Sequence, residues 1–185
     1  QQEFIPYVWG GSSLAGIPST STTVSNEKDG WWDWKNSHEE VLTSPREYGV
    51  DCSTLVALCA RIIGLPFYVR NTTAQKKYLK KSDTIQNGDL LWINRHVFIL
   101  CMIKDNYYVI EASGYETGFK QVTIKALQER FKNVKTFNDL MDLKKNNNPL
   151  ILIRPDGSES VHKEFEFLDL MSCVKINYQL QVLKK

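Results

Sequence analysis

The side chain best suited to chemistry is Cys52, which lies between small polar residues in the stretch 49–64, GVDCSTLVALCARIIG. The nucleophile in cysteine chemistry is the thiolate, and unpaired backbone N–H groups at the start of a helix favour that charge. The apolar residues that follow Cys52 recur at helical spacing. We therefore expect Cys52 in the first turn of a helix that has Asp51 as its N-cap, with the thiol facing the fold.

A nucleophilic thiol needs a general base, and His96 is the best candidate because it opens a strand expected inside the fold. His38 and His162 lie in polar segments, so we expect both on the surface. Glu111 interrupts an otherwise apolar strand and is the candidate for the group that orients the base. Each of the three residue types, taken alone, more often has a structural role at such a position.

The distance between His96 and Glu111 depends on the hairpin that joins their strands. A two-residue turn at Asp105-Asn106 would pair position 96 with 115 and position 111 with 100, which puts both side chains on one face but several residues apart. A turn at Lys104-Asp105, or a bulge, would instead bring His96 and Glu111 to a diagonal. The sequence leaves both registers open.

The elements around these residues predict an α+β fold, because one helix is followed by a run of antiparallel strands. We expect helices at 52–63, 72–81, 125–131 and 137–145, and strands at 89–94, 96–103, 107–113 and 149–155, with one or two more strands in 163–185. Gly64 and Pro66 should end the first helix.

A long loop is expected at about 12–48, because Ser, Thr and Gly are frequent there. Its WWDW stretch, Trp31 to Trp34, is interpreted as a plug in the core or as a platform for a sugar or peptide.

Composition excludes several classes of function. The chain has 185 residues, of which 42% are apolar and 24% charged, with a net charge of +2, as expected for one ordinary domain. It lacks the clustered basic residues of a nucleic-acid binder and the roughly 20 consecutive apolar residues of a membrane span. Four cysteines and three histidines show no zinc-ligand spacing. We therefore expect a monomer with no metal and no cofactor.

Seven short motifs follow one another in a fixed order: PYVWGG from Pro6, DCSTLV from Asp51, Leu65-Pro66, Gln75, GDLLW from Gly88, HVFIL from His96 and VIEAS from Val109. This order resembles the NlpC-type family of cell-wall cysteine peptidases over about residues 4–113. The resemblance implies a reduced papain-like fold, in which an N-terminal helix carrying the catalytic cysteine packs on an antiparallel sheet.

The same resemblance implies a nucleophile at Cys52, a base at His96 and a third polar residue at Glu111. It also implies that Tyr7, Asp51 and Ser53 hold the amino end of the substrate or support the oxyanion, and we place Trp9 of the first motif with them. The implied substrate is the stem peptide of bacterial peptidoglycan, cut between D-γ-glutamate and a diamino acid, either diaminopimelate or lysine. Such an enzyme would act outside the cell or in the periplasm.

Three departures from the family pattern stand out. Thr54 replaces the usual Gly after the DCS motif, Glu111 stands where the third residue is commonly His, and about forty residues separate the first two motifs. We expect a catalytic domain at 1–155 with the long inserted loop, and a C-terminal extension at 156–185 that adds strands to it. The alternatives are a thiol amidase or acyltransferase acting on another amide or ester, and an inactive cell-wall-binding module.

Overall fold

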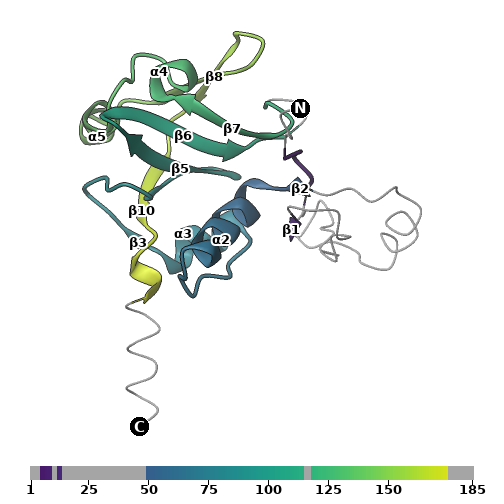
Figure 1. Cartoon of the computed structure of the whole chain (residues 1–185). Helices are drawn as coiled ribbons and strands as arrows, with labels where there is room; N and C mark the ends of the chain where they lie inside the picture. Colours follow the sequence, from purple (N-terminus) through teal and green to yellow (C-terminus); the bar gives the residue numbers. More distant parts are fainter. Residues whose placement is uncertain (1–4, 10–11, 14–48, 115–117, 175–185) are drawn as a thin grey trace, which may run out of the picture.

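The computed structural model describes residues 5–9, 12–13, 49–114 and 118–174. Six strands form one antiparallel sheet in the order β3-β10-β4-β5-β6-β7, and β1–β2 and β8–β9 form two small sheets (Figure 1). The strands are β1 (Ser12–Ser13), β2 (Gly49–Val50), β3 (Lys80–Lys81), β4 (Leu90–Ile93), β5 (His96–Ile103), β6 (Asn106–Ala112), β7 (Val122–Ala126), β8 (Leu150–Ile153), β9 (Glu159–His162) and β10 (Phe165–Asp169). The described helices include α2 (Cys52–Ile62), α3 (Thr72–Tyr78), α4 (Leu127–Arg130) and α5 (Phe137–Lys145). The predicted α+β class is confirmed.

Helix α2 begins and ends where the sequence predicts. The Asp51 side chain accepts a hydrogen bond from the backbone N–H of Thr54 and caps the N-terminus. At the other end Gly64 adopts a φ of 80°, and the N–H groups of Gly64 and Leu65 bond to the carbonyls of Arg61 and Ala60. This pair of bonds is a Schellman motif, which needs a left-handed residue and so favours glycine.

The large sheet is covered on both faces, as Figure 1 shows for α2 and α3 on one side and for α4, α5 and β8 on the other. Neighbouring residues of β4 alternate between the two cores: Leu90 and Trp92 belong to the first, whereas Leu91 and Ile93 belong to the second. Because both faces are covered, β4 is buried along its whole length and shows no polar alternation.

The hairpin between β5 and β6 turns at Lys104-Asp105, because Ile103 pairs with Asn106. Both turn residues have positive φ, 48° and 62°, which is typical of a type I′ turn. Of the two registers left open by the sequence, the structure adopts the tighter turn.

Several predicted boundaries are wrong. The helix expected at 72–81 ends at Tyr78, since Lys80–Lys81 forms the edge strand β3. The helical segment expected at 125–131 is a single turn preceded by the unpredicted strand β7. Ile63, whose helical spacing from Cys52 predicts that it shares the buried face of α2, is instead 67% exposed, because the helix ends there and the small residues Ala57 and Ala60 are buried.

Strands β9 and β10 both come from the segment assigned to a C-terminal extension. Strand β10 pairs with β3 and β4 inside the large sheet, so this segment is integral to it. Of the loop expected at about 12–48, Ser12–Ser13 instead forms strand β1, and residues 14–48, with Trp31 to Trp34 and His38, lie outside the described residues, as does the segment from 175 onward. Within the described part of the chain, no helix is long and apolar enough to span a membrane.

Candidate active site

Cys52 is the first residue of α2 and is 8% exposed. The backbone on either side of it is fixed by hydrogen bonds. Asp51 Oδ1 accepts from the Thr54 N–H at 2.7 Å, and the buried Gln75 side chain donates to the carbonyls of Ser53 and Val69 at 3.1 and 2.9 Å. The thiol therefore comes from a rigid helix start, where the adjacent N–H groups carry partial positive charge.

His96, the first residue of β5, makes a side-chain hydrogen bond to Glu111 and lies close enough to Cys52 for the charge of the thiolate to affect its pKa. Its Nε2 lies 2.9 Å from Glu111 Oε2, which leaves Nδ1 for the thiol. Burial by itself would lower the pKa of His96. The charge of the Cys52 thiolate and the hydrogen bond to it, followed by the hydrogen bond and charge of Glu111, outweigh burial and raise the pKa to about 9.

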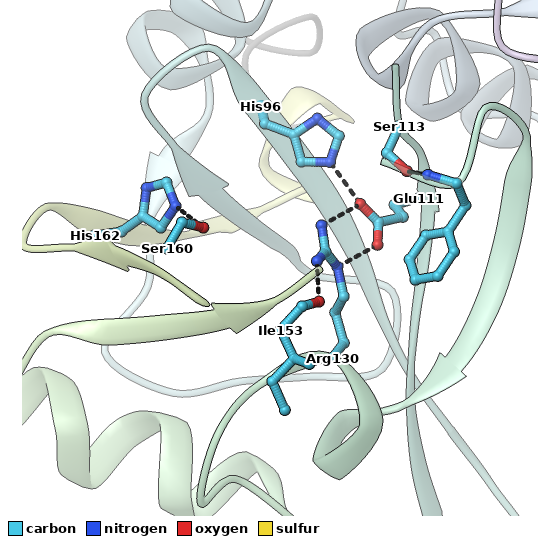
Figure 2. A network of polar contacts seen from close by, with 8 residues as sticks. His96, Glu111, Ser113, Arg130, Ile153, Ser160 and His162 are labelled. Carbon is cyan, nitrogen blue, oxygen red and sulfur yellow. Dashed lines mark hydrogen bonds and ion pairs between the residues drawn. The ribbon is translucent and has the colours of Figure 1, made fainter. Parts of the chain in front are cut away.

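Glu111 is fully buried in β6 and is held by two cations, as Figure 2 shows. Arg130, at the end of α4, donates from Nε to Oε1 and from Nη2 to Oε2, the latter at 3.2 Å. Burial would raise the pKa of Glu111, but the hydrogen bond and charge of His96 and then the charge of Arg130 hold it below the usual range. The carboxylate is therefore ionised and fixed in orientation.

The hairpin register explains how His96 meets Glu111. Continuing the observed pairs, such as Ile99 with Ile110, places position 96 opposite 113 and leaves position 111 on the diagonal. Both side chains lie on the sheet face that also carries Phe98, whose ring is 4.5 Å from the imidazole. Cys52 comes from the helix on the opposite face, so His96 reaches it around the end of the sheet.

Arg130 is the residue that sequence reasoning missed. It is 3% exposed, and Figure 2 shows its Nη1 donating to the carbonyl of Ile153 in β8 while its other nitrogens contact Glu111. One signal was present in the sequence, since Arg130 lies in a segment with helical spacing and a buried carboxylate requires a partner. No local sequence pattern, however, indicates that Glu111 and Arg130, which are 19 positions apart, form a pair.

The residues predicted to contact substrate lie in two places. Tyr7 is buried and packs beside Gly114, where an added Cβ would come within 3.2 Å of the ring, and its backbone bridges to Val50 next to the nucleophile. Trp9 is 57% exposed. Asp51 and Ser53 flank Cys52, and Ser53 Oγ lies 2.9 Å from Asp51 Oδ1 and 2.8 Å from the Arg70 carbonyl, so its hydroxyl is engaged within the fold.

A pocket of about 660 Å³ opens beside His96. Tyr7, Trp9, Ser113 and the turn at Asn94-Arg95 line it on one side, and the β8–β9 hairpin lines it on the other through Leu152, Arg154, Ser160 and His162. The expectation that His162 lies on the surface is wrong: it is partly buried, and its Nε2 lies 3.2 Å from Ser160 Oγ (Figure 2). In the described part of the chain, no three His, Cys, Asp or Glu side chains are grouped to hold a metal ion.

The site offers a thiol, an imidazole whose pKa responds to the charge of that thiol, and a buried carboxylate that is hydrogen-bonded to the imidazole, with space for a ligand alongside. This set of groups can perform nucleophilic attack and proton transfer. Comparison with family models, with curated proteins and with solved structures finds no match.

Proposed function

We propose that the chain is a papain-like cysteine endopeptidase that hydrolyses peptidoglycan stem peptides between D-γ-glutamate and a diamino acid, at the cell wall. One observation carries the proposal: His96 Nε2 lies 2.9 Å from an oxygen of the buried Glu111, and the same imidazole is close enough to Cys52 for the charge of the thiolate to raise its pKa. A histidine between a thiol and an orienting acid is the arrangement required for thiol-based acyl transfer.

The first half-reaction makes a thioester. The Cys52 thiolate attacks the carbonyl carbon of the amide, and the backbone N–H of Cys52 at the helix start stabilises the oxyanion that forms. The His96 imidazolium, whose pKa of about 9 keeps it protonated at neutral pH, gives its proton to the amide nitrogen. The C–N bond breaks, and the amine leaves.

The second half-reaction regenerates the thiol group. Neutral His96 removes a proton from water, the hydroxide adds to the thioester carbonyl, and the C–S bond breaks to release the acid. Glu111 stabilises the imidazolium in both half-reactions and fixes its ring orientation. Glu111 and, behind it, Arg130 are therefore positioning residues, because they act through His96.

The substrate class is supported by the order of the motifs from PYVWGG to VIEAS and by where the described ones lie. Tyr7 and Asp51, which the resemblance assigns to the amino end of a substrate, both lie next to Val50, two residues before the nucleophile.

Mass spectrometry of purified peptidoglycan fragments tests the proposal. The fragments are incubated with the wild-type protein, with Cys52→Ala and with Cys59→Ala, which removes a second thiol from the same helix and serves as the matched control. We expect the wild-type protein and Cys59→Ala to release the diamino-acid-bearing amine, and Cys52→Ala to release none.

Other outcomes separate the alternatives. If no variant cleaves the fragments while Cys52 still reacts with an alkylating probe, the substrate is another amide or an ester. If Cys52 neither cleaves nor alkylates, the chain is a binding module. Full activity of Cys52→Ala would contradict the site itself.

A further inference from the structure

The pocket beside His96 has an unusual set of charges. Its lining residues include the cations Arg95, Arg130 and Arg154 and the histidines His96 and His162, but no Asp or Glu among the described residues. Its volume of about 660 Å³ is within the range of small-molecule sites. A concave site lined by positive charges concentrates anionic ligands.

Two of these cations are available to a ligand. The charge of Arg130 is already offset by Glu111. Within the described ranges, neither Arg95 nor Arg154 takes part in an ion pair. The Arg154 guanidinium has a 3.4 Å contact with Ser158 Oγ, and, after the hydrogen bonds from Ser158, its charge is one of the influences that lower the pKa of the exposed Asp156 carboxyl. The environment of His162 agrees with an excess of positive charge, because burial and then the charges of Arg130, His96 and Arg154 all lower its pKa.

The position of the pocket identifies which part of a substrate would enter it. His96 lines the pocket, whereas Cys52 does not. Since His96 gives its proton to the departing nitrogen, the amine fragment must leave on the His96 side of the nucleophile. The part of the pocket that His96 and the β8–β9 hairpin line is therefore on the leaving-group side of the scissile bond, whereas Tyr7 and Trp9, which the resemblance places at the amino end of the substrate, line another part.

We propose that Arg95 and Arg154 form a subsite for the side-chain carboxylate of the leaving amine fragment, with His162 at its wall. This inference rests on the proposed function and narrows it. Diaminopimelate carries a carboxylate at the end of its side chain that lysine lacks, so the subsite favours a diaminopimelate-type fragment. Guanidinium groups suit this role because they bind carboxylates through two parallel hydrogen bonds.

The hairpin β8–β9 is what makes the subsite possible. Arg154 directly follows β8 and His162 ends β9, so both lie outside the residues that carry the NlpC-type resemblance. The hairpin is fixed to the catalytic network, because Arg130 donates to the Ile153 carbonyl as well as to Glu111. Arg130 therefore links the hairpin that carries Arg154 to Glu111, the residue that orients His96.

The test compares two synthetic substrates that differ only in the side-chain carboxylate, γ-D-glutamyl-diaminopimelate and γ-D-glutamyl-lysine, by their kcat/KM in a mass-spectrometric assay. We expect the wild-type protein to prefer the first by about 10- to 100-fold, the effect of one hydrogen-bonded charge pair. Arg154→Gln should lower the ratio of kcat/KM for the diaminopimelate substrate to kcat/KM for the lysine substrate from the wild-type value to about one. Arg61→Gln, at an exposed position on α2 outside the pocket, is the charge-matched control and should keep the preference.

Equal wild-type rates on the two substrates would overturn the subsite and leave the proposed function standing. A loss of activity in Arg154→Gln that is the same for both substrates would also overturn it, since the residue would then act on the scaffold. Cleavage of neither substrate would overturn the proposed function and the subsite with it.

Discussion

Replacing Glu111 by Gln removes one charge from the centre of the network and little else. The carboxylate is fully buried and is the counter-charge for Arg130, which is itself only 3% exposed. An amide of the same shape leaves the guanidinium buried without a negative partner. It also removes the hydrogen bond and charge that help to raise the pKa of His96.

The expected cost is large for a single substitution. Removing one partner of a buried ion pair costs about 3–5 kcal/mol, because the remaining charge stays desolvated. For a chain of this size each kcal/mol lowers Tm by about 2–4 °C, so Glu111→Gln should lower Tm by about 6–20 °C. The same change should shift the alkaline limit of activity to lower pH, since the pKa of His96 falls.

Thermal unfolding followed by circular dichroism measures the stability change. Glu159→Gln is the matched control, since Glu159 pairs with Lys132 at the surface and should cost no more than about 1 kcal/mol. The double variant Glu111→Gln/Arg130→Met should lose less than the sum of the single losses, because it leaves no unpaired charge. Strictly additive losses, or a loss for Glu111→Gln no larger than for Glu159→Gln, would refute the reasoning.

Three further predictions concern the same end of the molecule. Asp51→Ala removes the acceptor for the Thr54 N–H and should cost about 1 kcal/mol in the free energy of unfolding. Asp51→Asn keeps a capping oxygen and should cost much less. Equal losses for the two variants in denaturant titrations would contradict the capping role. Gly49→Ala puts a Cβ 2.6 Å from the Pro6 carbonyl oxygen and 2.5 Å from Val8 Cγ2, so the segment that carries Tyr7 must move. The free energy of unfolding should fall by about 1–3 kcal/mol, measured by thermal unfolding. An unchanged Tm would argue against this close contact. The kcat/KM of the wild-type protein should fall as pH rises through about 9, because His96 then loses the proton that it gives to the leaving amine; a profile that stays flat to pH 10 would exclude that role.

The helix that carries Cys52 could be predicted from sequence because its signals are local. Three local features predict this helix, and the structure contains all of them. They are Asp51 as the N-cap, apolar residues at helical spacing over about three turns, and Gly64 shortly before Pro66 at the C-terminal end. The α+β class followed from the order of the elements. The last turn of the helix was misjudged, because Ile62 and Ile63 have the right spacing but lie where the helix ends.

The hairpin register could not be decided from sequence. A type I′ turn is usually marked by Asn-Gly or Gly-Gly, whereas here two non-glycine residues, Lys104 and Asp105, adopt positive φ. The strand β7, which pairs with β6, was also missed, because its residues merge with the helical spacing that follows. The contact between His96 and Glu111 depended on this register.

The rest of the candidate site is tertiary in origin. Arg130 lies on a single helical turn, which no local pattern distinguishes from a surface turn, and only the packing of α4 against β6 and β8 brings it to Glu111. The pocket likewise depends on the β8–β9 hairpin folding back beside His96. That is why His162, in a polar stretch of sequence, was expected on the surface but lies in the wall of the pocket.

Whether Cys52, His96 and Glu111 act as one unit is tested most directly by the pKa of His96, measured by NMR titration of the imidazole. The chain has three histidines, so the resonances can be assigned by single substitutions. We expect a pKa of about 9 in the wild-type protein and a clearly lower value in Cys52→Ala, where the charge that raises it is absent. A wild-type pKa at or below 6.5, or a value that Cys52→Ala leaves unchanged, would contradict the proposed catalytic arrangement.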